Sequence, residues 1–154
     1  MIGQSDDLAT LKTLTSTLND SVNGYRESAE QVENQEYREL FLQFAERRER
    51  AASDLKEEVR RLGGDPDQDG STLGGLHQAW LDLKAAITGH DDKAIINEVE
   101  RGEDYLKEKW QAALQSGDLR GATHDLVERC YQSIKAGHDQ MSNLKHGMET
   151  SSHV

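Results

Sequence analysis

The chain has few of the residues that crosslink or interrupt helices. Its single cysteine, Cys130, excludes an internal disulfide and falls in a helical apolar stripe, where a small core residue is the simplest interpretation. One proline, Pro66, and a lean hydrophobic content of 34% suit long amphipathic helices with solvated outer faces. At 154 residues, we expect a single domain that spans residues 1–154.

Long apolar runs and an excess of basic charge are also missing. No stretch approaches the ~20 apolar residues that a membrane span needs. Residues 1–7 lack the basic and apolar parts of a signal peptide, so we expect a cytoplasmic protein. The formal net charge is −11, and an acidic surface repels phosphate backbones and anionic membranes. Nucleic acids and membranes are therefore not expected as partners.

Apolar residues recur at helical spacing in four long stretches, the pattern by which a helix buries one face. Gly63 and Gly64 end the second stretch, and Gly117 and Asp118 form a compact stop and restart between the third and fourth. The four predicted helices cover residues 6–33, 35–62, 91–115 and 118–145 of a bundle that spans about 6–146. The polar tail, residues 147–154, is expected to be disordered.

The connections predict an all-α, ferritin-like four-helix bundle. Very short turns join the first two helices and the last two, so each pair forms an antiparallel hairpin. A long crossover, residues 63–90, joins the hairpins and carries a short extra helix at about 72–88. A simple up-down bundle with a disordered linker is the alternative. Trp80 and its apolar neighbours favour the crossover, because they need a surface to pack against.

Five short stretches resemble a known family. They are residues 24–30 (GYRESAE), 58–66 (EVRRLGGDP), 80–86 (WLDLKAA), 100–104 (ERGED) and 136–139 (AGHD). The chain is similar over about residues 8–146 to an uncharacterised, mainly proteobacterial, ferritin-like four-helix-bundle domain of unknown function. The resemblance implies a ferritin-like bundle and implies no established activity.

Glu103 lies on the apolar stripe of the third predicted helix, where a leucine would be expected. A buried carboxylate needs a cation, a metal or good hydrogen bonds. Counting residues from the two hairpin turns brings Glu103 level with Arg47 and Tyr131. Arg48, the residue after Arg47, falls on the apolar stripe of the second predicted helix. We therefore predict a structural polar layer in which Arg48 pairs bidentately with Glu103 and Tyr131 adds a hydrogen bond.

A metal site is the alternative explanation for the same carboxylate. Di-iron bundles use one Glu from each of two helices and Glu-x-x-His from each of the other two. No Glu-x-x-His occurs on the second or fourth predicted helix, and the residue count puts His138 closer to Glu27 and Glu30 than to Glu103. The candidate ligands for iron or manganese are Glu30, Glu49, Glu100, Glu103 and His138.

Two functions follow from these observations. The first is a small non-enzymatic protein without a cofactor that works through association, as a homodimer or small homo-oligomer, with exposed parts of the crossover helix as the contact. The second is a di-metal carboxylate protein or oxidase-type bundle. No nucleophile–base pair or phosphate-binding loop can be read from the sequence, so no catalytic residue is assigned.

Overall fold

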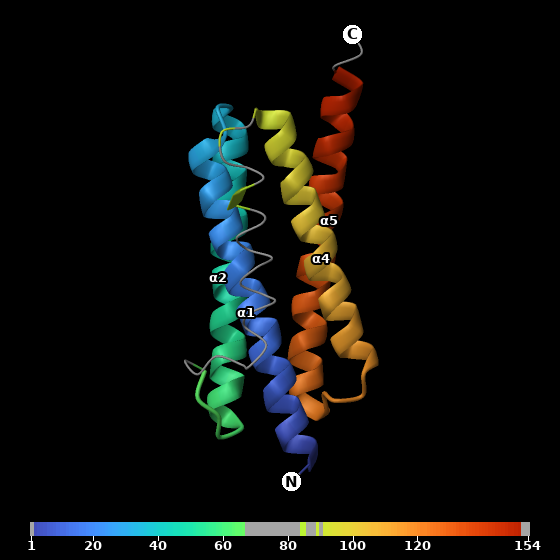
Figure 1. Cartoon of the computed structure of the whole chain (residues 1–154). Helices are drawn as coiled ribbons and strands as arrows, with labels where there is room; N and C mark the ends of the chain where they lie inside the picture. Colours follow the sequence, from blue (N-terminus) through green and yellow to red (C-terminus); the bar gives the residue numbers. More distant parts are fainter. Residues whose placement is uncertain (1, 67–83, 86–88, 90, 152–154) are drawn as a thin grey trace.

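Four long helices pack side by side in the structure (Figure 1). They are α1 (Ile2–Gln31), α2 (Gln35–Arg61), α4 (Asp92–Gln115) and α5 (Gly121–Ser151). The computed structural model describes residues 2–66, 84–85, 89 and 91–151, and within these ranges it contains no strand. The predicted all-α four-helix bundle is confirmed. None of the helices described is apolar over enough of its length to cross a membrane.

The ends of α2 and α4 follow from local capping chemistry. The side chain of Asn34 accepts hydrogen bonds from the backbone N–H groups of Glu36 and Tyr37, and the Asp91 side chain caps α4 in the same way. Gly63 follows α2 with a φ of +89°, a left-handed conformation that favours glycine. Both helices therefore match their predicted ranges to within one residue.

The start of α1 and both ends of α5 differ from the prediction. Helix α1 begins at Ile2, four residues early, and α5 begins at Gly121, three residues late. Inside the turn before α5, the backbone N–H of Asp118 donates to the Ser116 hydroxyl. Helix α5 also continues to Ser151. Residues 147–151 are thus helical in the structure, where one glycine costs a helix only ~1 kcal/mol, and the disorder expected for the tail stays a prediction. Residues 152–154 lie outside the described part.

Contacts between the turns show how the helices run. The backbone N–H groups of Glu33 and Asn34 donate to the carboxylate of Asp92 at 2.8 and 3.0 Å. The α1–α2 turn therefore lies beside the start of α4. At the opposite end, the Thr10 hydroxyl lies 3.4 Å from Asp118 in the α4–α5 turn. Helices α2 and α4 run in one direction and α1 and α5 in the other (Figure 1). The predicted extra helix at 72–88 falls almost wholly outside the described residues.

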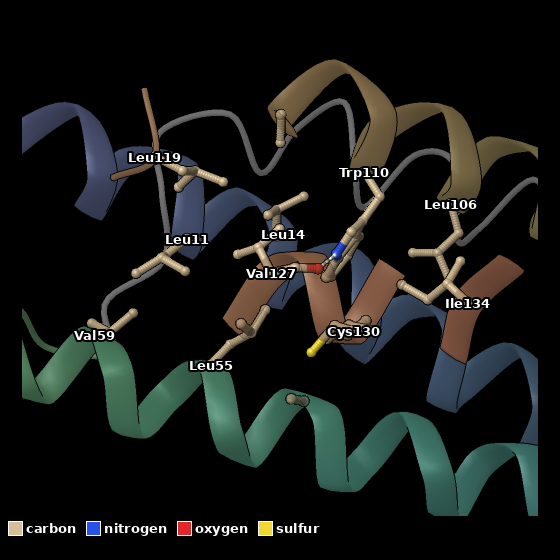
Figure 2. Packing of buried hydrophobic residues seen from close by; sticks show 13 residues of the cluster. Leu11, Leu14, Leu55, Val59, Leu106, Trp110, Leu119, Val127, Cys130 and Ile134 are labelled. Atoms are coloured by element: carbon tan, nitrogen blue, oxygen red, sulfur yellow. Dashed lines mark hydrogen bonds between the residues drawn. The ribbon is translucent and has the colours of Figure 1, made fainter. Parts of the chain in front are cut away.

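The buried apolar residues form two clusters along the bundle. One surrounds Trp110, whose indole N–H donates to the carbonyl of Val127 at 3.0 Å (Figure 2). The other contains Phe41, Phe44 and the ring of Tyr25. Cys130 belongs to the Trp110 cluster, as predicted, and burial raises the pKa of its thiol to about 11. The two clusters together supply apolar surface along most of the bundle.

Two leucines on α2 test this assignment of the core. Leu55 is 0% exposed and Leu42 is 48% exposed. Leu55→Ala should lower the free energy of unfolding by ~2–5 kcal/mol, because it leaves a cavity in the Trp110 cluster. Leu42→Ala should change it by less than ~0.5 kcal/mol. Urea denaturation followed by far-UV circular dichroism measures both values, and equal losses would contradict the assignment.

Candidate functional site

The carboxylate of Glu103 is held by Arg48 in the middle of the bundle. Nη1 and Nη2 of Arg48 each donate to a different oxygen of Glu103 at 2.8 Å. The two side chains are 3% and 2% exposed, so water screens the pair very little. Arg48 comes from α2 and Glu103 from α4. The predicted bidentate ion pair is therefore confirmed.

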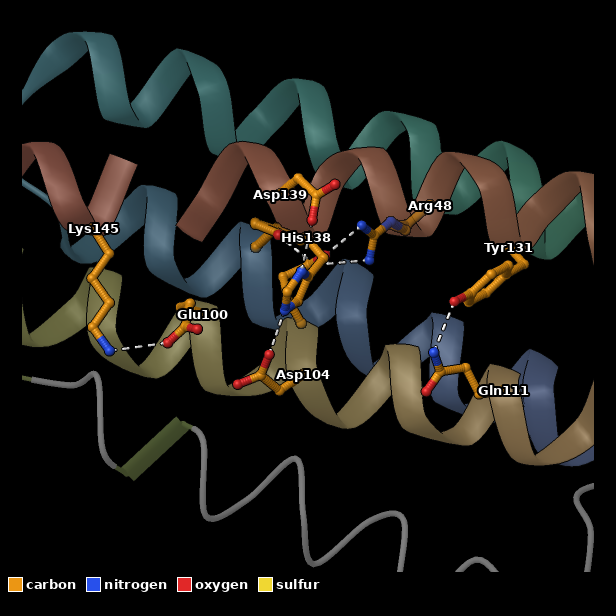
Figure 3. A network of polar contacts seen from close by, with 10 residues as sticks. Arg48, Glu100, Asp104, Gln111, Tyr131, His138, Asp139 and Lys145 are labelled. Carbon is orange, nitrogen blue, oxygen red and sulfur yellow. Dashed lines mark hydrogen bonds and ion pairs between the residues drawn. The ribbon is translucent and has the colours of Figure 1, made fainter. Parts of the chain in front are cut away.

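The third member of this polar layer is Tyr25, not Tyr131. The Tyr25 hydroxyl donates to Glu103 Oε1 at 2.5 Å, whereas the Tyr131 hydroxyl accepts from Gln111 at 2.9 Å (Figure 3). The hydroxyl of Ser21 accepts a further bond from Arg48 at 3.1 Å. The prediction for Tyr131 is wrong in height along the bundle, because Tyr131 contacts Gln111, which lies about two helical turns beyond Glu103 on α4.

Aromatic rings enclose the polar layer on one side. The ring of Tyr25 stacks on Phe44 with centroids 5.2 Å apart, and the Arg48 guanidinium carbon lies 5.8 Å from each ring. Burial, together with the nearby charge of Glu103, raises the pKa of Tyr25 well above its usual value. Burial lowers the pKa of Arg48, but Glu103 and Tyr25 outweigh it and the pKa is raised. Arg48 therefore stays charged, and Tyr25 stays a proton donor.

Gly137 on α5 provides the space for this layer. A Cβ atom at position 137 would lie 2.8 Å from Nη2 of Arg48, 2.8 Å from the Phe44 ring and 3.6 Å from Oε2 of Glu103. Any larger side chain would push into the ion pair. Helix α5 therefore approaches Arg48 and Phe44 of α2 closely at Gly137.

A second polar group lies at the outer edge between α4 and α5 (Figure 3). Nε2 of His138 is 2.5 Å from a carboxylate oxygen of Asp104, and its Nδ1 is 3.2 Å from Asp139. Glu100 stands one turn before Asp104 and receives a bond from Lys145 at 3.1 Å. Burial lowers the pKa of His138, but the hydrogen bonds to Asp104 and Asp139 outweigh it, and the pKa is raised.

A comparison with protein families identifies the family of this chain. Residues 6–116 match the sequence profile of a family described as Domain of unknown function (DUF2383). The chain belongs to this family. A search of curated proteins found no match. The matched part of the DUF2383 chain includes Tyr25, Arg48 and Glu103, whereas Gly137 and His138 lie on α5, beyond the match.

The structure separates the five predicted metal ligands. Glu30 is exposed, and Glu49 is exposed and pairs with Arg26 at 2.8 Å. Glu103 faces Arg48 in the core. Only Glu100 and His138 come together. Asp104, which was not predicted, joins them. Among the residues described, these three are the one group of His, Cys, Asp or Glu side chains whose ligand atoms, one from each, all lie within 4.8 Å of one another.

The predicted neighbours of His138 are wrong for a specific reason. The residue count brought it near Glu27 and Glu30 of α1, but it contacts Asp104 of α4. Gly137, six residues beyond Tyr131, is the residue beside Glu103. The turn before Gly121 is longer than predicted, so every position on α5 shifts relative to α4. The i, i+4 spacing of Glu100 and Asp104 was the available signal for this group.

The charge pair can be tested by removing one partner. Glu103→Ala should lower the free energy of unfolding by ~3–5 kcal/mol, because Arg48 is left buried and unpaired. Glu49→Ala, which breaks an exposed pair, should cost less than ~1 kcal/mol. Chemical denaturation measures both. A near-neutral Glu103→Ala would show that the layer is solvated.

The space at Gly137 can be tested with a single methyl group. Gly137→Ala should destabilise the protein by ~1–3 kcal/mol, because the methyl overpacks against Arg48 and Phe44. Gly147→Ala is the matched control on α5, since nothing lies within 4 Å of its Cβ position, and it should be neutral or stabilise by up to ~1 kcal/mol. If thermal melts show both variants equally stable, the close approach at Gly137 is refuted.

Proposed function

We propose that this protein is a non-enzymatic helical bundle that acts by association with a second copy of itself. In this proposal the layer of Arg48, Glu103 and Tyr25 is a structural part of the core. One observation carries the structural role. Both oxygens of Glu103 are bonded by the Arg48 guanidinium, and one of them also accepts from Tyr25. The cation that this carboxylate needs is thus supplied by the chain.

The surroundings of the other carboxylates also favour a structural role over a di-iron or di-manganese centre. Such a centre draws inward-facing ligands from four helices. Glu30 and Glu49 are exposed. Glu58, the other buried glutamate of the described residues, accepts from Thr123 at 2.6 Å and from Arg61 at 2.7 Å. A di-metal centre at Glu103 would have to displace a buried guanidinium.

Helix direction supports a ferritin-like connectivity, which we include in the proposal. Helices α2 and α4 start at the same end of the bundle, so the chain has to return along the bundle between them. A proteobacterial source and a cytoplasmic location remain predictions from the sequence. The net charge of −11 supports the prediction that neither nucleic acids nor membranes are partners.

The surface of the described helices supports a contact through the connecting segment. Leu42 is the single large apolar side chain that the described residues expose. The four helices thus turn almost all of their apolar surface inward. The remaining apolar stripe in the sequence is Leu73, Leu76, Trp80, Leu83 and Ile87. We propose that this stripe forms the contact between two copies.

Sedimentation velocity over a wide range of protein concentrations tests the association. We expect the wild-type chain to sediment as a dimer at high concentration, and Leu76→Glu/Trp80→Glu to sediment as a monomer with unchanged far-UV circular dichroism. Leu42→Glu is the matched control and should remain a dimer.

Two results would count against the proposed association. One is a wild-type monomer at every concentration. The other is a double variant that loses thermal stability and keeps the mass of the wild type, because the stripe would then pack within its own chain. Neither result bears on the structural role of Glu103, which the denaturation of Glu103→Ala tests separately.

A further inference from the structure

We propose that Glu100, Asp104 and His138 form a binding site for a single divalent transition-metal ion at the outer edge between α4 and α5. This site is separate from the buried pair of Arg48 and Glu103. It is also independent of the proposed association. Three features support this site: the distances between the three side chains, the contact of the second imidazole nitrogen of His138, and the exposure of the ligands.

The three side chains already stand close to a coordinating arrangement. Each offers one ligand atom, and these atoms lie within 4.8 Å of one another. Bonds of ~2.0–2.2 Å to zinc hold neighbouring ligand atoms ~3–4 Å apart, so small side-chain rotations suffice. Glu100 and Asp104 are four residues apart on α4 and so share a face, and His138 reaches them from α5. Two rigid helices thus hold the ligands in position.

The second ring nitrogen of His138 is bonded in the way that metal-binding histidines require. Its Nδ1 lies 3.2 Å from a carboxylate oxygen of Asp139, while Nε2 points to Asp104 (Figure 3). In metal sites a carboxylate on the far nitrogen fixes the ring orientation and makes the ligating nitrogen more basic. Asp139 is therefore assigned as the residue that orients His138.

Exposure and ligand type indicate which ion would fit. The side chains of His138 and Glu100 are 15% and 16% exposed, whereas Asp104 is 48% exposed. Two ligands are thus shielded, and one side stays open for water. One imidazole and two carboxylates suit zinc, iron(II) or manganese(II) better than calcium, because imidazole is a borderline ligand. Zinc(II) is the simplest probe because it has no redox chemistry.

Lys145 provides a distinctive feature of this site. Its ammonium donates to Glu100 at 3.1 Å and so competes with a metal for the same oxygen. The lysine stem is long and flexible, so the ammonium can move aside at modest cost. Removing this charge should therefore strengthen metal binding. A purely structural role for the Lys145–Glu100 pair would not produce that effect.

Isothermal titration calorimetry with zinc chloride tests the site in the untagged, full-length chain. We expect one zinc per chain. His138→Gln and Asp104→Asn should each weaken binding at least ~10-fold, as should Asp139→Asn through the orientation of the ring. Lys145→Gln should strengthen binding several-fold. His124→Gln is the matched control on α5, because His124 also lies beside an aspartate, Asp125, and is outside the group.

Several results would overturn the proposal. Absence of stoichiometric zinc uptake by the wild-type chain is one. Equal affinity of wild type and His138→Gln, or a comparable loss in His124→Gln, would mean that zinc binds elsewhere. Far-UV circular dichroism on every variant ensures that a loss of binding is not a loss of fold. Binding that survives in Glu103→Gln would support the outer position, and binding lost only in Glu103→Gln would contradict it.

Discussion

Burying Glu103 is the constraint on which the packing of this bundle depends. A carboxylate taken out of water needs a cation and hydrogen bonds in its place. Arg48 on α2 and Tyr25 on α1 supply these, and Gly137 on α5 leaves the space. All four helices must therefore be correct in height and rotation at one layer. A slip of one residue moves a side chain ~1.5 Å along a helix and about 100° around it, which would break the layer.

The layer specifies the packing more than it adds free energy. Replacing a buried ion pair by apolar residues of similar volume is often neutral or stabilising, whereas losing one partner is costly. The stabilising free energy comes from the two apolar clusters, which lie along the bundle around Trp110 and around Phe44. Stacking of Tyr25 on Phe44 excludes water from the charges and so strengthens their attraction. The residues of the polar layer thus carry the free-energy cost of burying charge and also specify how the helices pack.

The sequence predicted the helices and one contact of the site, and missed features that depend on the reach of a long side chain or on turn length. Helical periodicity and capping residues placed α2 and α4 to within a residue. The pairing of Glu103 with Arg48 was predictable because the α1–α2 turn and the start of α4 share one end of the bundle. Tyr25 was missed, because its long side chain reaches Glu103 from a different height. The neighbours of His138 were missed because the α4–α5 turn is longer than predicted.

The burial of Cys130 has a use that its packing does not suggest. The thiolate is the reactive form of cysteine, and a shielded thiol with a pKa of about 11 contributes almost none of it at neutral pH. Alkylation of the folded chain should therefore be slow and should speed up when the bundle opens around α5. Because the chain has one cysteine, the labelling rate reports a single location. The rate of alkylation thus measures local opening of the helices around Cys130, and no cysteine has to be engineered into the chain.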